Sequence, residues 1–265
     1  MRMSNYEHLS VGRGNEVVTV SLARPDARNA LNAGLIGELT RCMEELAGDD
    51  GVRVVVLTGE GDFFCAGADV GYMRDTANFS YEENMEDARE LAAMFRAVEE
   101  CPKPVVARVR GAAIGGGVGL VAASDVAVAE DGTIFAFSEV RLGISPATIA
   151  PFVLRKIGPS HTRALFLTGE RFDVQRAQAI GLVHEVASEG DLDAAVREKV
   201  EGLLAGGPGA LAATKVLLRE LRDAAPGKAT EVMARRIAEL RTGEEGQEGL
   251  GAFLEKREPA WREPS

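Results

Sequence analysis

Short valine-rich runs that end in glycine constrain this sequence more than any other feature. The runs at 52–58 (VRVVVLT) and 105–109 (VVARV) are each followed by a glycine-rich segment and then by a pattern with helical spacing. Continuous apolar runs of this length are typical of strands buried on both faces of a parallel sheet. The repeated order of strand, glycine turn and helix therefore predicts an α/β fold.

The rest of the chain extends this pattern and then changes character. A further strand is expected at 16–22, and a helix is expected from Asn32 to Gly48, which have the residue types of a helix start and stop. The remaining expected elements are a helix at 81–100, short strands at 126–129, 134–137 and 183–186, and helices at 191–204, 208–222, 228–241 and 244–257. We therefore divide the chain into an α/β core, residues 1–190, and a C-terminal helical region, residues 191–265.

Composition excludes several classes of function. With 41 acidic against 30 basic residues the formal net charge is −11, and no basic stripe with interleaved aromatics occurs, which argues against nucleic acid as a partner. The three cysteines, Cys42, Cys65 and Cys101, and three histidines lack the spacing of a disulfide framework or a metal site. No window approaches the roughly 18 apolar residues of a membrane span, and the first residues lack an apolar targeting segment. We expect a cytoplasmic protein without membrane contact.

Glycine placement carries the strongest chemical signal. The run from Gly115 to Gly119 fits neither the dinucleotide fingerprint nor the P-loop pattern, and no serine-hydrolase or zinc-peptidase motif occurs. Two segments, 66–69 (AGAD) and 115–117 (GGG), each follow a buried strand and precede a helix. Backbone N–H groups from two such turns can form an oxyanion hole, because small residues let a carbonyl oxygen approach to about 3 Å. The alternative is that these glycines only permit tight turns and close helix packing.

Ordered stretches across most of the chain resemble the enoyl-CoA hydratase/isomerase family, also called the crotonase superfamily. They are RPDARNALN (24–32), FFCAGAD (63–69), CPKPVVARVRGAAIGGGVGL (101–120), SDVAVA (124–129), FAFSEVRLGISPATIAPFVLRKIG (135–158), AQAIGLV (177–183) and GAFLEKREPAW (251–261). The resemblance implies a crotonase-like spiral of ββα units with a C-terminal helical trimerisation region, assembled as a homotrimer or a dimer of trimers. It also implies an acyl-CoA substrate, carried as a coenzyme A thioester, with no prosthetic group.

By the same resemblance, the N–H groups of Ala68 and Gly116 would hold the thioester oxygen, and Glu139 would be the acid/base. Hydratases of this family carry a second glutamate at the position of Gly119, so one carboxyl group of the usual pair is missing. Isomerases of the family, which move a 3-enoyl double bond to position 2, work with a single glutamate at the Glu139 position. Hydratase, isomerase and a catalytically weak acyl-CoA-binding protein therefore remain open.

We favour a hydratase, because GGGVGL, FSEVRLGISPATIAPFVLRKIG and FSYEENMEDARELAAMF (79–95) resemble bacterial methylglutaconyl-CoA hydratase-like proteins of leucine catabolism. The expected reaction is hydration of 3-methylglutaconyl-CoA or dehydration of 3-hydroxy-3-methylglutaryl-CoA. Arg74 and Arg141 are candidates to bind the distal carboxylate of the acyl group. Candidates to replace the missing glutamate are Glu83, Asn84 and Asp87.

The resemblance also implies a coenzyme A site. Arg24, Ala27, Arg28 and Asp69 would lie near the nucleotide, the backbones of Ala66 and Ala68 would face the adenine, and Phe253 and Lys256 would reach the coenzyme A of a neighbouring subunit. Cys65 stands beside the oxyanion segment, but without a positioned histidine it is interpreted as a small apolar filler rather than a nucleophile.

Overall fold

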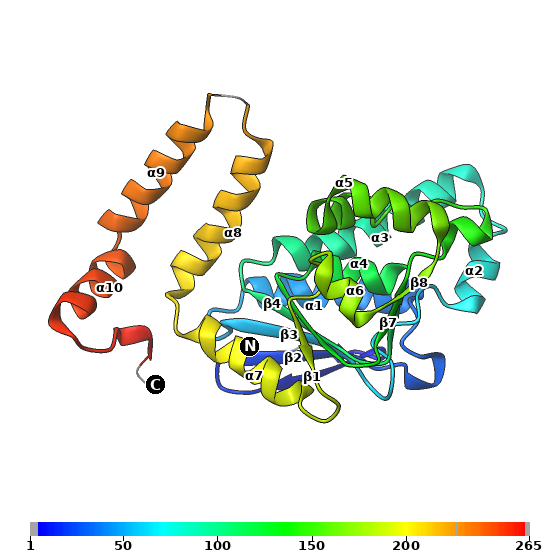
Figure 1. The fold of residues 1–265 in the computed structure, drawn as a ribbon, viewed down its shortest axis with the longest axis horizontal. Coiled ribbons are helices and arrows are strands. Elements are labelled where there is room, and N and C mark those ends of the chain that lie inside the picture. The colour runs from blue at the N-terminus through cyan, green and yellow to red at the C-terminus, as the bar shows by residue number, and fades with distance from the viewer. Residues whose placement is uncertain (1–4, 226, 263–265) are drawn as a thin grey trace.

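The computed structural model describes residues 5–225 and 227–262 and places two β-sheets among helices (Figure 1). In chain order the elements are β1 (Leu9–Arg13), β2 (Val17–Leu22), η1 (Pro25–Ala27), α1 (Ala33–Ala47), β3 (Val54–Gly59), α2 (Val70–Thr76), α3 (Tyr81–Glu100), β4 (Val105–Val109), β5 (Ala112–Ile114), α4 (Gly116–Ala123), β6 (Val126–Glu130), β7 (Ile134–Ala136), η2 (Glu139–Leu142), α5 (Ala150–Thr168), β8 (Arg171–Asp173), α6 (Val174–Ala179), β9 (Glu185–Ala187), α7 (Leu192–Leu204), α8 (Pro208–Asp223), α9 (Ala229–Thr242), α10 (Glu244–Glu255) and η3 (Ala260–Arg262). The expected α/β organisation is present.

The larger sheet has the strand order β1-β2-β3-β4-β6-β9. The pair β1–β2 is antiparallel, and every later neighbour in this sheet is parallel. A smaller sheet has the order β5-β7-β8, with β5 parallel and β8 antiparallel to β7. Since parallel neighbours need crossover connections, helices cover both faces of the larger sheet.

The central strand β3 is buried along its whole length, as its valine-rich sequence predicts. Val55 and Leu57 pack into the main core with α1 and α3, whereas Val54 and Val56 face α7 on the other side of the sheet. Alternate residues of a strand point to opposite faces, so this one run joins both cores. The helix α7, grouped above with the C-terminal helices, is thus packed directly on the sheet (Figure 1).

The helices α8 and α9 run antiparallel and stand away from the sheets, and α10 leads the chain back toward the end of α7 (Figure 1). We call residues 208–255 the C-terminal arm. It carries large apolar side chains that are exposed in the single chain, namely Leu218, Met233, Ile237, Leu250, Phe253 and Leu254. Within the described ranges, no helix combines the length and apolar character needed to cross a bilayer.

Candidate active site

Four backbone segments lie side by side where the predicted site residues occur. The segments are 28–31, 65–69, 112–115 and 134–136, and we call them the ladder. The bonds that join neighbouring segments are Ala66 N–H to Arg28 O (3.0 Å), Leu31 N–H to Gly67 O (2.7 Å), Asp69 N–H to Leu31 O (2.9 Å), Cys65 N–H to Ala112 O (3.1 Å), Ile114 N–H to Cys65 O (3.0 Å) and Gly115 N–H to Ala136 O (2.8 Å). The ladder therefore brings both glycine segments and the strand before Glu139 into one place.

The register of the ladder places the two predicted oxyanion donors at corresponding positions of neighbouring segments. Cys65 pairs with Ala113 in parallel, and Ala68 and Gly116 each lie three residues further along the two segments. Because Leu31 bonds to the residues on either side of Ala68, the Ala68 N–H points away from it. Gly116 is the first residue of α4, where an N–H has no acceptor within the helix. Neither amide donates a hydrogen bond to any atom of residues 5–225 and 227–262.

Glu139 lies against the turn that leads into α4. A Cβ atom built on Gly115 would stand 3.0 Å from Oε1 of Glu139, and Gly115 itself has φ +50° and ψ −116°. The Oε2 atom is buried and has no hydrogen-bond partner. Burial raises the pKa of this carboxyl above its ordinary value, since the charged form is poorly solvated. The structure thus places the half-buried Glu139, the predicted acid/base, beside Gly115, the residue that precedes Gly116.

The position of the family's second glutamate is closed by apolar packing. A Cβ on Gly119 would overlap Cγ2 of Ile149 and would lie 2.8 Å from Cε1 of Phe95. The Phe95 ring also reaches within 3.7 Å of a Cβ placed on Gly116. Phe95 and Ile149 are both buried. A carboxyl group therefore has no room at residue 119, and the wall facing Gly116 is hydrocarbon.

The three polar residues considered as replacements for that glutamate are engaged elsewhere. Glu83 forms a reciprocal capping box with Ser80 at the start of α3, and Asn84 donates to the carbonyl oxygens of Phe79 and Ser80. Asp87 accepts a hydrogen bond from the Tyr72 hydroxyl of α2. Glu83 and Asn84 thus bond to groups at the N-terminal end of α3, and Asp87 links α3 to α2.

Two of the expected coenzyme A residues, Arg24 and Asp69, bind each other beside the ladder. Arg24 donates to the Ala30 carbonyl and forms an ion pair with Asp69 (Nη2 to Oδ2, 2.8 Å), and this hydrogen bond helps lower the pKa of Asp69. Asp69 also caps α2 through the amides of Gly71 and Tyr72. These two side chains hold the protein together at this point, so their nucleotide contacts stay a prediction.

The other nucleotide candidates are more open. Arg28 is exposed in a left-handed conformation (φ +52°), with its guanidinium 5.2 Å from the centre of the Phe63 ring. Ala27 and Ala66 are half-buried, and Ala68 is exposed. Arg28 is therefore a cation available to a phosphate beside the ladder.

Four further predicted residues are exposed. Phe253, at 79% exposure, and Lys256 lie at the end of α10, where Phe253 does not pack within its own chain. Arg74 ends α2 and Arg141 lies in η2 two residues after Glu139. The structure leaves the roles of all four as predictions and shows only that their side chains face outward.

Cys65 is fully buried, and burial raises the pKa of its thiol to about 12. A thiol that holds its proton so firmly is a poor nucleophile. This agrees with the interpretation of Cys65 as a small apolar side chain that fills space. Among the described residues, no group of three or more His, Cys, Asp or Glu side chains is arranged to hold a metal ion. Glu139 and the amides of Ala68 and Gly116 therefore stay the predicted reacting groups at the ladder.

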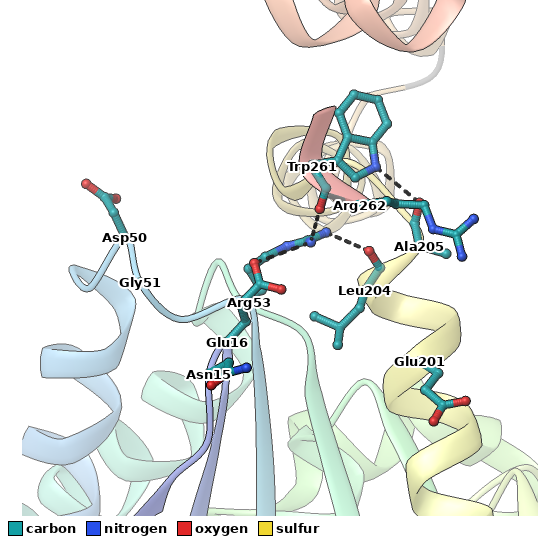
Figure 2. Close-up of a pocket in the computed structure, with 10 residues that line it drawn as sticks. All are labelled: Asn15, Glu16, Asp50, Gly51, Arg53, Glu201, Leu204, Ala205, Trp261 and Arg262. Atoms are coloured by element: carbon teal, nitrogen blue, oxygen red, sulfur yellow. Dashed lines mark hydrogen bonds and ion pairs between the residues drawn. The ribbon is translucent and has the colours of Figure 1, made fainter. Parts of the chain in front are cut away.

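A cavity of about 880 Å³ lies away from the ladder, at the base of the C-terminal arm (Figure 2). Its central residue is Arg53, whose buried side chain donates to the carbonyl oxygens of Trp261 (2.9 Å), Leu204 (2.9 Å) and Gly206 (2.5 Å). The Trp261 indole donates to Ala205 O (3.2 Å). These bonds tie the start of β3 to the end of α7 and to the returning C-terminus, so this cavity marks a structural joint.

Sequence reasoning missed the residues that shape the apolar side of the site. Phe95 was expected only as part of the buried face of a helix, Ile149 was assigned no role, and Tyr72 lay in a stretch predicted as loop. The available signal was Gly119, because a glycine inside a helix permits close approach of a neighbour. It did not identify which side chains approach.

Comparison with known proteins agrees with this geometry. The family model described as Enoyl-CoA hydratase/isomerase matches residues 12–264. An enoyl-CoA hydratase of Alternaria alternata is 37% identical over 95% of this chain and 85% of its own length, and the 2,3-dehydroadipyl-CoA hydratase of Escherichia coli is 35% identical over 96% and 98%. The crystal structure of an enoyl-CoA hydratase from Shewanella pealeana superimposes with a TM-score of 0.93 at 38% identity, covering 96% of both chains. The fold is the crotonase fold, and the chain belongs to the enoyl-CoA hydratase/isomerase family.

Proposed function

We propose that this protein hydrates the double bond of a 2-enoyl-CoA thioester, or catalyses the reverse dehydration, with Glu139 as acid/base. The observation that carries this is the meeting of a buried carboxyl, with one unpartnered oxygen, and the free amides of Ala68 and Gly116. Amides aimed at a thioester oxygen stabilise the enolate that forms when C3 is attacked. Each such donor contributes about 3–4 kcal/mol to lowering a barrier of this kind.

A single carboxyl group can complete the reaction. The Glu139 carboxylate takes a proton from water while the water oxygen bonds to C3, and the electron pair of the double bond passes to the thioester oxygen as the enolate. The protonated Glu139 then gives that proton to C2, so the carboxylate is restored and one water has been added. The raised pKa of Glu139 favours the first transfer, because a carboxylate with a higher pKa is a stronger base toward water.

The acyl group that we propose is 3-methylglutaconyl, with 3-hydroxy-3-methylglutaryl-CoA as the hydrated product. Its support is the resemblance of residues 79–95, 115–120 and 137–158 to methylglutaconyl-CoA hydratase-like proteins. The Escherichia coli relative is named for a substrate, 2,3-dehydroadipyl-CoA, that also bears a distal carboxylate. Addition or loss of water at a branched C3 develops positive charge at that carbon, which lessens the need for a second carboxyl. Arg74 and Arg141 are the exposed cations offered to the distal carboxylate.

One observation favours an isomerase as the second candidate. Because the Gly119 position is closed by Phe95 and Ile149, Glu139 stands alone, and one base is sufficient to move a proton between C2 and C4. A protein that only binds acyl-CoA is the third candidate, but binding requires no buried carboxyl beside the reacting carbon.

Purified protein supplied with 3-methylglutaconyl-CoA, crotonyl-CoA and a 3-enoyl-CoA separates these candidates. We expect kcat/KM to be highest for 3-methylglutaconyl-CoA. Turnover is monitored by the loss or gain of absorbance of the conjugated thioester. Preference for the 3-enoyl substrate would replace hydratase by isomerase. Binding of all three without turnover of any would leave the acyl-CoA-binding function.

For the assembled protein we propose a homotrimer, or a dimer of trimers, in the cytoplasm, without a prosthetic group. The exposed apolar residues of the C-terminal arm support it, because large patches of this kind mark interfaces in soluble proteins. Coenzyme A would then meet Arg28 of one subunit and Phe253 and Lys256 of the next. Sedimentation should give a mass of three or six times 28.1 kDa, and replacing both Phe253 and Leu254 by Glu should lower it and raise KM. A monomer with an ordinary KM would contradict this assembly.

A further inference from the structure

The helix α2 is attached to the rest of the protein by very few contacts. None of its residues is buried, and it begins immediately after Ala68 and Asp69 of the ladder. Asp69 secures its first turn. Further along, the Tyr72 ring packs on the edge of the main core and its hydroxyl donates to Oδ1 of Asp87 on α3. We call this link the Tyr72–Asp87 bridge.

The bridge shares a helix face with the apolar wall of the site. Asp87, Leu91 and Phe95 are spaced by four residues, so they lie in a row along α3. Phe95 contacts the positions of Gly116 and Gly119, and Leu91 packs against the same core. At a rise of about 1.5 Å per residue, Asp87 stands about 12 Å along the helix from Phe95. The row therefore starts beside Gly116 and Gly119 and ends at the bridge.

The bridge is well shielded and negatively charged. Tyr72 and Asp87 are both half-buried, and burial together with the hydrogen bond to Asp87 raises the pKa of Tyr72. Glu90, one turn further along α3, adds a second negative charge near the Tyr72 ring. A long apolar acyl chain that entered between α2 and α3 would have to break the bridge. An acyl chain of that length ending in a carboxylate would also be repelled by Asp87.

We propose that the Tyr72–Asp87 bridge is a specificity determinant that closes the far end of the acyl pocket, so that this protein accepts compact acyl groups and rejects long ones. The inference deepens the proposed function and rests on its general form, an acyl-CoA site at the ladder. Tyr72 and Asp87 act on the far end of the acyl group and take no part in proton transfer at C2 and C3.

The test compares a four-carbon with a ten-carbon thioester in variants that break or keep the bridge. Tyr72→Phe and Asp87→Ala each remove one partner, whereas Asp87→Asn keeps an oxygen that can accept the hydroxyl proton. The structure also supplies a matched control, the hydrogen bond from Tyr6 to Glu45 Oε2 (2.9 Å), which joins the N-terminal segment to α1. Tyr6→Phe loses an equivalent bond away from α2 and α3.

We measure kcat/KM for crotonyl-CoA and trans-2-decenoyl-CoA, and Kd for butyryl-CoA and decanoyl-CoA. We expect Tyr72→Phe and Asp87→Ala to shift both ten-carbon to four-carbon ratios toward the long chain by about five- to tenfold, the worth of one shielded hydrogen bond. Asp87→Asn and Tyr6→Phe should keep the wild-type ratios. Unchanged ratios in Tyr72→Phe and Asp87→Ala would overturn the proposal, as would an equal shift in Asp87→Asn, which would assign the effect to charge.

The two kinds of measurement keep this proposal separate from the proposed reaction. Saturated acyl-CoAs bind without reacting, so their affinity ratio supports or overturns the bridge even where hydration is never observed. Thermal unfolding of each variant distinguishes a lost fold from a changed preference, because a general loss of structure lowers both affinities together.

Discussion

The Oε1 atom of Glu139 lies 3.0 Å from the point at which any larger residue at Gly115 would place its Cβ atom. The turn of Gly115 also presents the Gly116 amide. One glycine therefore affects the position of both the proposed acid/base group and one proposed oxyanion donor.

Gly115→Ala should damage catalysis more than stability. A non-glycine residue at φ +50° costs about 1–3 kcal/mol, and the added methyl would displace the Glu139 carboxyl and the Gly116 amide. We expect kcat to fall about 10²-fold. The control is Gly132→Ala, a left-handed turn position (φ +77°) with open space around it, which should lose stability but keep kcat. Equal kcat values in the two variants would contradict the role given to Gly115.

Replacing Glu139 by Gln should lower the rate by about 10²–10⁴-fold, as expected for a lost general acid/base. In the wild type, kcat/KM should rise with pH through a midpoint above the ordinary glutamate value of about 4.3, because burial raises the pKa and the reaction begins from the carboxylate. Activity of the variant close to that of the wild type would remove Glu139 from the mechanism.

The same raised pKa predicts how Glu139→Gln changes stability. A carboxyl whose pKa is higher in the folded than in the unfolded state weakens the fold once the pH exceeds the unfolded value, since a buried charge must then form. Glu139→Gln should therefore have a higher Tm than the wild type at pH 7–8. The difference should shrink as the pH falls toward the unfolded value of about 4.3 and vanish well below it, where both states keep the proton. A difference that grew toward acid pH would show that the shift has the opposite sign.

Gly119→Ala should destabilise the protein although alanine favours helices. The methyl group would overlap Ile149 and crowd Phe95, and overpacking of this kind costs about 1–3 kcal/mol. Gly37→Ala, inside α1 with nothing within 4 Å of the new methyl, should instead stabilise by about 0.5–1 kcal/mol. Urea unfolding of both variants measures this contrast. Stabilisation by both would mean that the Gly119 position is open, with room for the missing glutamate.

Arg53→Met should lower the free energy of unfolding by about 3 kcal/mol, because the carbonyl oxygens of Trp261, Leu204 and Gly206 lose a charged donor that is itself buried. Arg53→Lys should recover only part of the loss, since an ammonium cannot match the spread of a guanidinium. Arg13→Met, which breaks an exposed ion pair with Asp49, serves as the control and should cost less than about 1 kcal/mol. Similar losses in the Arg53 and Arg13 variants would show that the joint is of minor importance.

Local sequence signals predicted much of the fold. Asn32 and Gly48 bound α1 as expected, and the helical spacing of 81–100 matches α3 residue for residue. The signals failed where an element depends on its neighbours. The helix α2 has no buried face to create a pattern, and α5 is kinked at Gly158, just before Pro159, so neither was expected from periodicity.

The candidate site divides in the same way. The glycines before helices were visible in the sequence because turn geometry favours them, whereas Glu139 was identified only through the family resemblance. The closure of Gly119 by Phe95, and the Tyr72–Asp87 bridge, come from packing between separate helices, which no single segment encodes. Arg24 and Asp69 were expected as two ligands of a nucleotide, and only the folded chain shows them bound to each other.

The ladder makes one part of this protein unusually resistant to mutation. The amides of Ala68 and Gly116 are main-chain groups positioned by main-chain hydrogen bonds, so among substitutions at these two residues only proline removes the N–H itself. By contrast, a single substitution can replace the carboxyl group of Glu139 or one of the apolar side chains, Phe95 and Ile149, that pack against Gly119. On the proposed mechanism, substitutions can therefore change where protons are transferred while the main-chain amides proposed to hold negative charge on a thioester oxygen are kept.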